Sequence, residues 1–194
     1  MSVSAFKSLG IEKTIEQKIE EIQSLYQENK IPWVIGYSGG KDSTAVTQLT
    51  WMAINQLPPE ERMKPIYVIT TDTMVENPVV SSWVESSLMQ MKSEAKMEEM
   101  PIKPNLLKPA LKDRFWVNLI GRGYPAPRRG FRWCTDRLKI RPSNDFIKTV
   151  VSKHGEAIML LGVRSAESAA RAKTIKSHKK EGSKLSDHQN LPNC

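Results

Sequence analysis

A short apolar run that ends in Ser38-Gly39-Gly40-Lys41-Asp42-Ser43 limits the possible folds of this chain more than any other feature. Residues 33–37 are typical of a buried strand, and we expect a helix to begin at residues 42–43. The two glycines between them allow positive φ angles and let the backbone approach an oxyanion closely. Backbone N–H groups in such a turn, with the positive end of the helix, form a concave anion site. The segment therefore predicts a phosphate-binding loop.

The side chains of this loop suit an anionic ligand as well. Ser38 and Ser43 add hydroxyl donors, Lys41 adds a point charge, and Thr44 follows in the first turn of the expected helix. The loop is not a Walker A motif, which requires Gly-x-x-x-x-Gly-Lys-Ser/Thr, because its glycines are closer together and Asp42 follows the lysine. An ordinary glycine turn before a helix is the alternative interpretation.

Apolar runs alternate with helical patterns along the chain. We expect helices before Ile31, at about 42–56 and 78–96, and from Pro142 to His154, with strands at about 33–37, 66–70, 103–107 and 157–161. Near-continuous apolar strands separated by helices predict an α/β fold with a parallel sheet. Ligands of such sheets bind beyond the carboxyl ends of the strands, so the loop, Asp72 and residues 162–164 should meet in one crevice.

Two carboxylates are candidate ligands of Mg²⁺. Asp72 follows the second strand and is close in sequence to Glu76. Mg²⁺ prefers hard oxygen ligands and keeps several waters, which suits a carboxylate beside a bound triphosphate. The alternative is that Asp72 caps a turn or the helix after it. Asp42 is the second candidate, although an aspartate in a first helical turn also complements the helix dipole.

Residues 121–141 combine a dense run of basic side chains with interleaved aromatic ones. Arginine makes bidentate contacts with phosphate, and aromatic rings stack on bases. Glycine and proline favour an irregular loop here, which we expect to contact polyphosphate or nucleic acid; a solvated basic surface is the alternative. The candidate nucleic-acid contacts are Arg128, Arg129, Arg132, Arg137 and Lys139.

Cys134 lies inside this basic stretch, where positive charge favours the thiolate and so nucleophilic or metal-ligand chemistry. A buried, inert cysteine is the alternative. Cys194 is the only other cysteine, and two thiolates fall short of the four that typically hold an iron–sulfur cluster. Further ligands would have to come from outside this sequence.

The chain changes character after the last expected strand. Gly162 and Arg164 follow that strand as candidate ATP contacts, with Arg164 placed to bind phosphate; a helix start with a Glu167–Arg171 pair is the alternative. Residues 165–194 are rich in serine, lysine and histidine and poor in large apolar residues. We therefore expect one catalytic domain at 1–164 and a mobile basic loop at 165–194, the start of a longer C-terminal region.

Composition limits the partners and the cellular compartment that we expect for this chain. The 194 residues carry a formal net charge of +8, which favours polyanionic partners. Apolar runs do not approach the roughly 20 residues that span a bilayer, and the N-terminus lacks the pattern of a secretory signal. With too few cysteines for a disulfide framework, we expect a reducing cytoplasm and no membrane partner.

Four segments together resemble a known family. SGGKDST, TDTMVENP, WCTDRLKIRP and GVRSAES occur in this order, as in proteins similar to phosphoadenosine-phosphosulfate reductases. The chain most resembles the DNA phosphorothioation sulfurtransferases of the Dnd system. SGGKDS by itself resembles the PP-loop of ATP pyrophosphatases, whereas the combination with WCTDRLKIRP is more specific. The resemblance implies the three-layer, adenine nucleotide alpha hydrolase-like (PP-loop) fold.

The resemblance also implies chemistry and partners. Such enzymes split ATP into AMP and pyrophosphate, and they help to replace a non-bridging oxygen of DNA by sulfur that a cysteine desulfurase supplies to the Dnd subunits. It implies that residues 38–43 bind ATP phosphates, that Asp72 lies near nucleotide and Mg²⁺, and that Arg164 belongs to the crevice. Cys134 is implied as a ligand of a [4Fe-4S] cluster or a sulfur-handling residue, and Cys194 is a further candidate ligand.

Three other functions remain open from the sequence. A phosphoadenylyl-sulfate reductase would release sulfite without consuming ATP, and a tRNA thiolase would modify RNA instead of DNA. A catalytically silent nucleotide- or DNA-binding scaffold comes from a different class of protein. Release of pyrophosphate from ATP excludes the reductase and the scaffold, and the choice of DNA or tRNA separates the remaining two.

Overall fold

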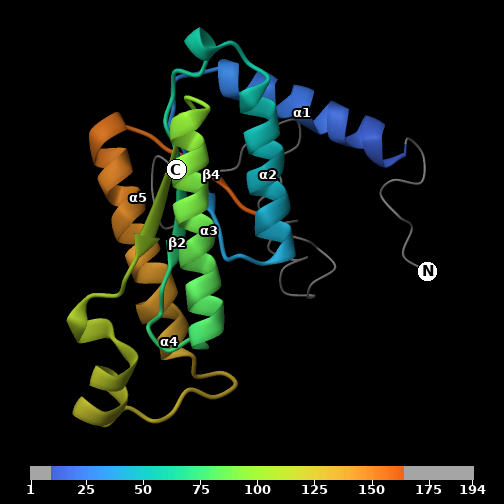
Figure 1. Cartoon of the computed structure of the whole chain (residues 1–194). Coiled ribbons are helices and arrows are strands. Elements are labelled where there is room, and N and C mark those ends of the chain that lie inside the picture. Colours follow the sequence, from blue (N-terminus) through green and yellow to red (C-terminus); the bar gives the residue numbers. More distant parts are fainter. Residues whose placement is uncertain (1–9, 164–194) are drawn as a thin grey trace.

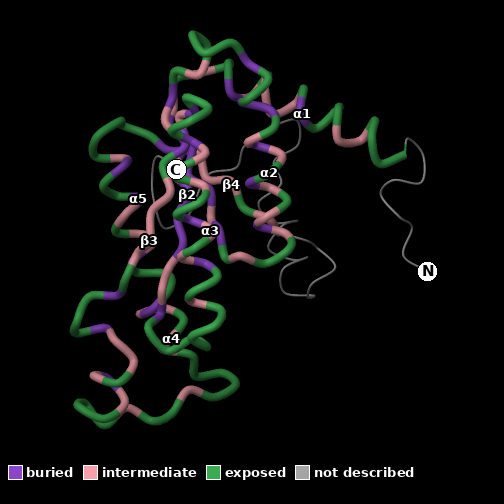
Figure 2. Tube along the Cα trace, in the orientation of Figure 1, coloured by how far each residue is buried: buried purple, intermediate pink, exposed green. Residues whose placement is uncertain are grey.

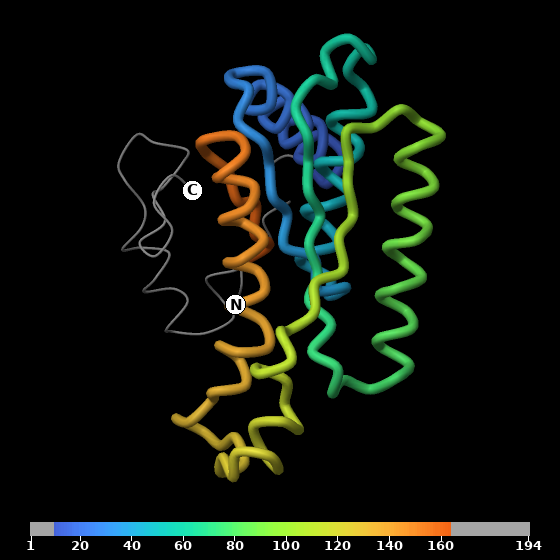
Figure 3. Tube along the Cα trace, turned by 90° about the vertical axis from the view of Figure 1, so that its left-hand side faces the viewer, coloured from blue at the N-terminus to red at the C-terminus, as the bar shows by residue number. Residues whose placement is uncertain are grey.

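The protein is built on a parallel sheet between two layers of helices (Figures 1 and 3). The computed structural model describes residues 10–163. Within them the strands are β1 (Trp33–Gly36), β2 (Ile66–Thr71), β3 (Ile102–Leu107) and β4 (Ile158–Leu160), in the spatial order β3-β2-β1-β4. Every pair of neighbouring strands is parallel. The prediction of a parallel α/β fold is confirmed.

Three of the main helices lie within one or two residues of their predicted positions, and the first ends at Gln27, four residues before Ile31. The main helices are α1 (Ile11–Gln27), α2 (Lys41–Asn55), α3 (Pro78–Met97) and α5 (Arg141–His154). Short helical turns are η1 (Pro59–Glu61), η2 (Leu111–Asp113), η3 (Val117–Gly121), α4 (Trp133–Thr135) and η4 (Asp136–Ile140). The start of α3 is fixed by Asn77, whose side chain accepts a hydrogen bond from the N–H of Val79 at 2.9 Å, with Pro78 at the first helical position.

The strands are apolar on both faces because helices cover both. Ile35 and Val68 are fully buried on the face that α1, α2 and α3 cover. Val34 points to the opposite face and packs with Ile147 and Val150 of α5. Figure 2 shows the buried positions concentrated in the sheet and on the inner faces of these helices. The near-continuous apolar runs in the sequence follow directly from this sandwich.

Residues 108–140 leave the sheet after β3 and form a projection beyond its carboxyl edge (yellow in Figure 1). The expectation of an irregular loop across 121–141 is wrong for its second half. The chain is continuously helical from Trp133 to His154, through α4, η4 and α5. In η4 the N–H of Arg141 donates to the carbonyl of Asp136, five residues back, which is the wide spacing of a π-helix. Pro142 lacks an N–H and its ring would crowd the carbonyl four residues earlier, so the wide turn accommodates it.

Lys64 is a buried lysine that packs against two aromatic rings. Lys64 is only 4% exposed, and its ammonium lies 4.8 Å from the ring centre of Tyr26 and 4.6 Å from that of Trp33. Burial lowers the pKa of Lys64 from 10.5 to about 8. The hydroxyl of Tyr26 donates to the carbonyl of Lys64 at 2.8 Å, and burial raises the pKa of Tyr26 to about 12.

We expect stability to rise with pH between about 8 and 10. In this window the unfolded chain keeps the Lys64 proton that the folded chain has lost, so the free energy of unfolding should increase by about 1–2 kcal/mol. Above pH 10 the retained proton of Tyr26 works in the opposite direction. Urea titrations at pH 8 and 10 of the wild type and Lys64→Met measure this difference. An equal rise in the variant would contradict the assignment to Lys64.

Candidate functional site

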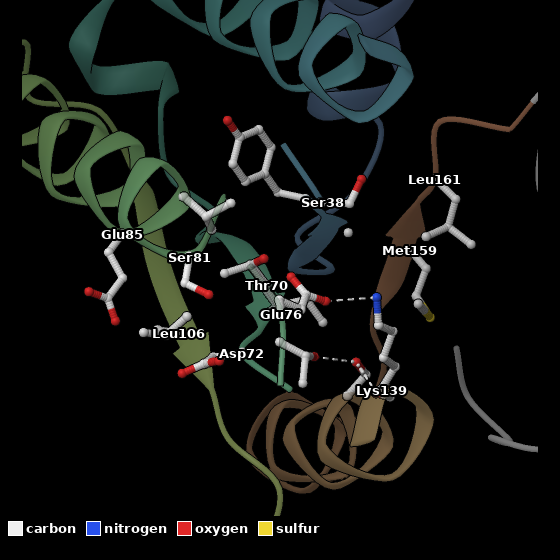
Figure 4. Close-up of a pocket in the computed structure, with 16 residues that line it drawn as sticks. Ser38, Thr70, Asp72, Glu76, Ser81, Glu85, Leu106, Lys139, Met159 and Leu161 are labelled. Carbon is white, nitrogen blue, oxygen red and sulfur yellow. Dashed lines mark hydrogen bonds and ion pairs between the residues drawn. The ribbon is translucent and has the colours of Figure 1, made fainter. Parts of the chain in front are cut away.

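A cavity of about 240 Å³ opens at the carboxyl edge of the sheet. Its wall comes from the ends of β1, β2 and β4, from the first half of α3, and from η4 (Figure 4). Ser38 and Asp72, which are far apart in sequence, both line it. Ser38 of the glycine-rich loop and the end of β2 therefore meet in one crevice, as expected, whereas residues 39–44 and 162–163 lie outside its wall. On the α3 side, Ser81 and Glu85 add a hydroxyl and a carboxylate to the wall.

The glycine-rich loop is closed by its two serines. The N–H of Ser38 donates to Oγ of Ser43 at 3.2 Å, and the two hydroxyl oxygens lie 3.1 Å apart. Ser43 also donates to the carbonyl of Gly40 at 3.0 Å, and the N–H of Thr44 donates to the same carbonyl at 2.9 Å. Ser43 is buried, so its hydroxyl shapes the loop from beneath, whereas Ser38 reaches the cavity.

Gly39 and Gly162 each occupy a position in or beside the loop that a larger residue would not fit. Gly39 has φ +71°, a conformation that other residues rarely adopt, whereas Gly40 is extended. Gly162, just after β4, lies against the first turn of α2: a Cβ there would be 2.6 Å from the carbonyl oxygen of Asp42 and 3.0 Å from the nitrogen of Ser43. The end of β4 therefore holds the start of α2 in place by direct backbone packing.

Asp72 is held at the mouth of the cavity in a fixed orientation. Its N–H donates to the carbonyl of Leu107 at 2.9 Å, which extends the pairing of β2 with β3. One carboxylate oxygen accepts from the N–H of Met74 at 2.8 Å, and the other lies 3.7 Å from Nζ of Lys108. The carboxylate thus caps the turn after β2, as the alternative interpretation expected, and also faces the cavity.

This arrangement fits a magnesium ion that is bound largely through phosphate and water. Within residues 10–163, His, Cys, Asp and Glu side chains do not gather in groups of three or more suited to a metal. Mg²⁺ at nucleotide sites often takes only one or two carboxylates, with the remaining ligands from phosphates and waters. Asp72 suits that role by its place in the cavity wall. Asp42 lies in the first turn of α2, outside that wall, and remains the second candidate.

Comparisons with known proteins agree with this architecture. The solved structure of the U34-tRNA thiolase NcsA from Methanococcus maripaludis, with its [4Fe-4S] cluster, superposes with a TM-score of 0.54 at 17% identity. The match covers 99% of this chain and 62% of that one. The chain therefore shares the fold of that solved structure. This confirms the three-layer, adenine nucleotide alpha hydrolase-like architecture expected from the sequence.

Sequence comparisons identify a distant relative but no family. A curated relative, the uncharacterized protein MJ0066 of Methanocaldococcus jannaschii, is 27% identical over 158 residues. The match covers 81% of this chain, but the chain spans only 28% of that relative's length. No protein-family profile matches the chain.

Lys139, one of the predicted nucleic-acid contacts, lies at the cavity with its side chain 59% exposed. Its side chain lines the cavity, and its ammonium pairs with the carboxylate of Glu76 at 3.1 Å (Figure 4). The two residues come from η4 and from the turn between β2 and α3, so the ion pair spans the mouth of the cavity.

Arg137 also differs in place from the other predicted nucleic-acid contacts. It donates to Oδ1 of Asn118 at 2.8 Å and to the hydroxyl of Tyr124 at 2.7 Å, and it lies 3.4 Å from the carboxylate of Asp113. Asp113 pairs with Arg141 too, at 3.0 Å. These contacts make Arg137 a structural centre of the projection.

Asp113 and Asn118 are the residues that the sequence interpretation missed. Both are buried, and Asn118 donates to the carbonyls of Lys112 and Arg114 at 3.0 and 2.8 Å. The available signal was an isolated aspartate in a segment of lysine and arginine, a composition in which a single carboxylate is a natural partner for several cations.

Three of the arginines predicted to contact nucleic acid are exposed: Arg128, Arg129 and Arg132. Arg128 and Phe131 form an isolated antiparallel bridge, with backbone hydrogen bonds of 3.1 and 2.9 Å, and Gly130 has φ +87° within the turn between them. Phe131 and Trp116 are themselves 41% and 58% exposed. The projection thus presents arginines beside unburied aromatic rings.

Cys134 is a free, half-buried thiol in α4. Within the described residues it is the only cysteine, so this part of the chain offers one thiolate, fewer than a [4Fe-4S] cluster takes. The described residues therefore do not fit a complete cluster site. Arg164, Cys194 and the expected mobile loop at 165–194 lie outside the described residues. The helices of residues 10–163 include none long and apolar enough to cross a bilayer.

Proposed function

We propose that this protein is an ATP pyrophosphatase that activates a nucleic-acid acceptor for sulfur transfer. The observation that carries the proposal is the junction of the PP-loop with the cavity, where the loop, Asp72 and the end of β4 meet. The loop offers backbone amides and the N-terminus of α2 to phosphates, and the cavity beside it extends along β2 toward Ser81 and Glu85 of α3. The resemblance of the sequence to phosphorothioation enzymes supports the acceptor.

In the first step, an oxygen of the acceptor phosphate attacks the α-phosphorus of ATP. The bond from that phosphorus to the bridging oxygen breaks, and pyrophosphate leaves. Lys41, at the first position of α2, and the amides of the PP-loop would stabilise the charge that develops on pyrophosphate. Asp72 would hold Mg²⁺, which supplies charge neutralisation at the phosphates when bound.

In the second step, hydrosulfide attacks the adenylated acceptor phosphorus. The new P–S bond replaces the bond to the oxygen that carries the adenylyl group, and AMP leaves with that oxygen. We propose a cysteine desulfurase as the source of sulfur, whose persulfide a thiol reductant converts to hydrosulfide with formation of a disulfide, and Dnd subunits as partners, as the resemblance implies. Cys134 is the candidate sulfur-handling residue of the described part, and no step is assigned to an iron–sulfur cluster.

DNA is the first acceptor and tRNA the second. The DNA phosphate is favoured by the sequence resemblance, in which WCTDRLKIRP is the most specific segment. The tRNA alternative is supported by the structural neighbour, which is named as a U34-tRNA thiolase. In tRNA thiolation, the adenylated atom would be a base oxygen, and sulfur would replace it with release of AMP.

The test is the identity of the products formed from ATP. The full chain, purified without oxygen, is incubated with ATP, Mg²⁺, sulfide and either DNA or tRNA, and AMP, ADP, pyrophosphate and incorporated sulfur are measured. We expect AMP and pyrophosphate, lost in Ser38→Ala and Asp42→Ala and kept in the exposed α5 controls Ser152→Ala and Asp145→Ala. ADP and phosphate, or no AMP with either acceptor, would contradict the proposal. Sulfur in tRNA alone would select the second acceptor.

We expect the exposed arginines to determine how the affinity for nucleic acid depends on salt concentration. Removing Arg128, Arg129 and Arg132 together should weaken binding of DNA at low salt and lower the slope of log K against log salt by about 2–3, because each phosphate contact contributes about 0.9. Fluorescence anisotropy with labelled DNA at several salt concentrations measures the slope. The control removes three exposed lysines elsewhere, Lys92, Lys148 and Lys153. An equal change in the control would show a general charge effect and refute a site on the projection.

A further inference from the structure

Trp83 of α3 makes an unusual contact with the PP-loop. A Cβ built on Gly39 would lie 2.4 Å from Cζ3 of this tryptophan, and 3.2 and 3.3 Å from Cε3 and Cη2. The six-membered part of the indole therefore covers the space that a side chain at position 39 would need. Position 39 is restricted to glycine twice, once by its φ of +71° and once by this ring.

Packing in the hydrophobic core does not explain why α3 carries a tryptophan at position 83. The side chain is 51% exposed, whereas Val84 and Leu88 of the same helix are buried in the core. These two residues fix α3 against the sheet, so the helix provides a rigid base for the indole. The ring then covers Gly39, the loop residue with the positive φ, whereas the hydrogen bonds of the two serines hold the loop at Ser38, Gly40 and Ser43.

Helix α3 also forms one wall of the cavity, through Ser81, Val84 and Glu85. Trp83 thus connects that wall to the phosphate loop by direct contact. A small displacement of loop amides strongly reduces their interaction with developing charge, so a side chain that fixes the loop affects catalysis without touching the ligand.

We propose that Trp83 is a positioning residue, whose indole packs on Gly39 and holds the PP-loop in its anion-binding conformation. The inference rests on the proposed function in one respect, because the anion is taken to be the pyrophosphate portion of ATP. The contact itself does not depend on the identity of the ligand.

The first experiment measures binding of inorganic pyrophosphate and of ATP, each with Mg²⁺, by calorimetry on the full chain. Trp83→Ala should weaken pyrophosphate binding about tenfold, because the loop loses its support. Trp83→Phe keeps an aromatic ring and should retain most of the affinity. Met89→Ala removes another large exposed side chain from α3 and should change nothing. Circular dichroism checks that each variant is folded.

The second experiment is a double-mutant cycle on stability without any ligand. Gly39→Ala should lower the midpoint of urea unfolding more in the wild type than in Trp83→Ala, because the clash with the ring is present only in the first. The φ penalty of alanine is common to both backgrounds and cancels.

The outcomes separate the two ideas. If the wild type binds pyrophosphate and ATP but the cycle is additive, or Trp83→Ala binds as tightly as the wild type, the role of Trp83 is overturned and the proposed function stands. Equal losses in Trp83→Phe and Trp83→Ala would also overturn it. If the wild type binds neither ligand while the cycle shows coupling, the contact is supported and the proposed function fails.

Discussion

Replacing Gly162 with alanine is expected to lower the rate of AMP and pyrophosphate formation about a hundredfold, the size of effect that a displacement of about 1 Å at a reacting group produces. The new methyl carbon would lie 2.6 Å from the carbonyl oxygen of Asp42 and 3.0 Å from the nitrogen of Ser43. Both atoms are backbone, so they cannot move aside as a flexible side chain would. Either the end of β4 or the first turn of α2 must shift, and the PP-loop amides shift with it.

The control for this substitution is Gly121→Ala. A Cβ at Gly121 meets no heavy atom within 4 Å, and its φ lies outside the positive range. Both variants add the same methyl group, and only the first adds it against the loop. Steady-state kinetics with ATP and thermal unfolding should be measured on both. Normal turnover in Gly162→Ala would show that β4 does not hold the loop.

Replacing Asp113 with alanine is expected to lower the free energy of unfolding by about 3 kcal/mol, the usual scale for removing one partner of a buried ion pair. Its carboxylate, with a side chain only 7% exposed, pairs with Arg137 at 3.4 Å and with Arg141 at 3.0 Å. Alanine would leave the half-buried guanidinium of Arg137 without that partner. Urea unfolding followed by circular dichroism measures the loss.

Asp136→Ala provides the matched comparison, because Asp136 also pairs with Arg141, at 2.8 Å. Its side chain is 51% exposed, so the loss should be about 0.5 kcal/mol, as for other surface pairs. Similar losses in the two variants would mean that burial of Asp113 does not decide the strength of its contacts. Tryptophan emission would report the projection in particular, because Trp133 stacks on Phe115 and donates to the carbonyl of Pro125 within it.

The sheet, its helices and the PP-loop were predictable because each rests on local pattern. Strands buried on both faces are apolar throughout, and a glycine pair between such a strand and a helix has few other uses. Asp72 and the loop could be placed together because parallel strands end at one edge of the sheet. The backbone conformation of each loop glycine could not be predicted from the sequence: Gly39 has a positive φ, while Gly40 does not.

The projection was the least predictable part because its structure depends on contacts between distant residues. A run of basic side chains does not reveal which of them are exposed. Arg137 is occupied by Asp113 and Asn118, whereas Lys139, two positions later, faces the cavity and Glu76. Pro142 was predicted to start a helix because proline is common at the first helical position. The π-turn before it, which lets the helix continue through the proline, produces no periodic pattern in the sequence.

That π-turn can be regarded as a single residue inserted into an otherwise ordinary helix. Each residue of an α-helix turns the chain by about 100°. Deleting one position within Asp136–Ile140 would restore regular winding and rotate Trp133 and Cys134 about the axis of α5 by roughly that angle. The direction in which the thiol of Cys134 faces is therefore set by the length of the chain here, and one inserted or deleted residue would redirect it.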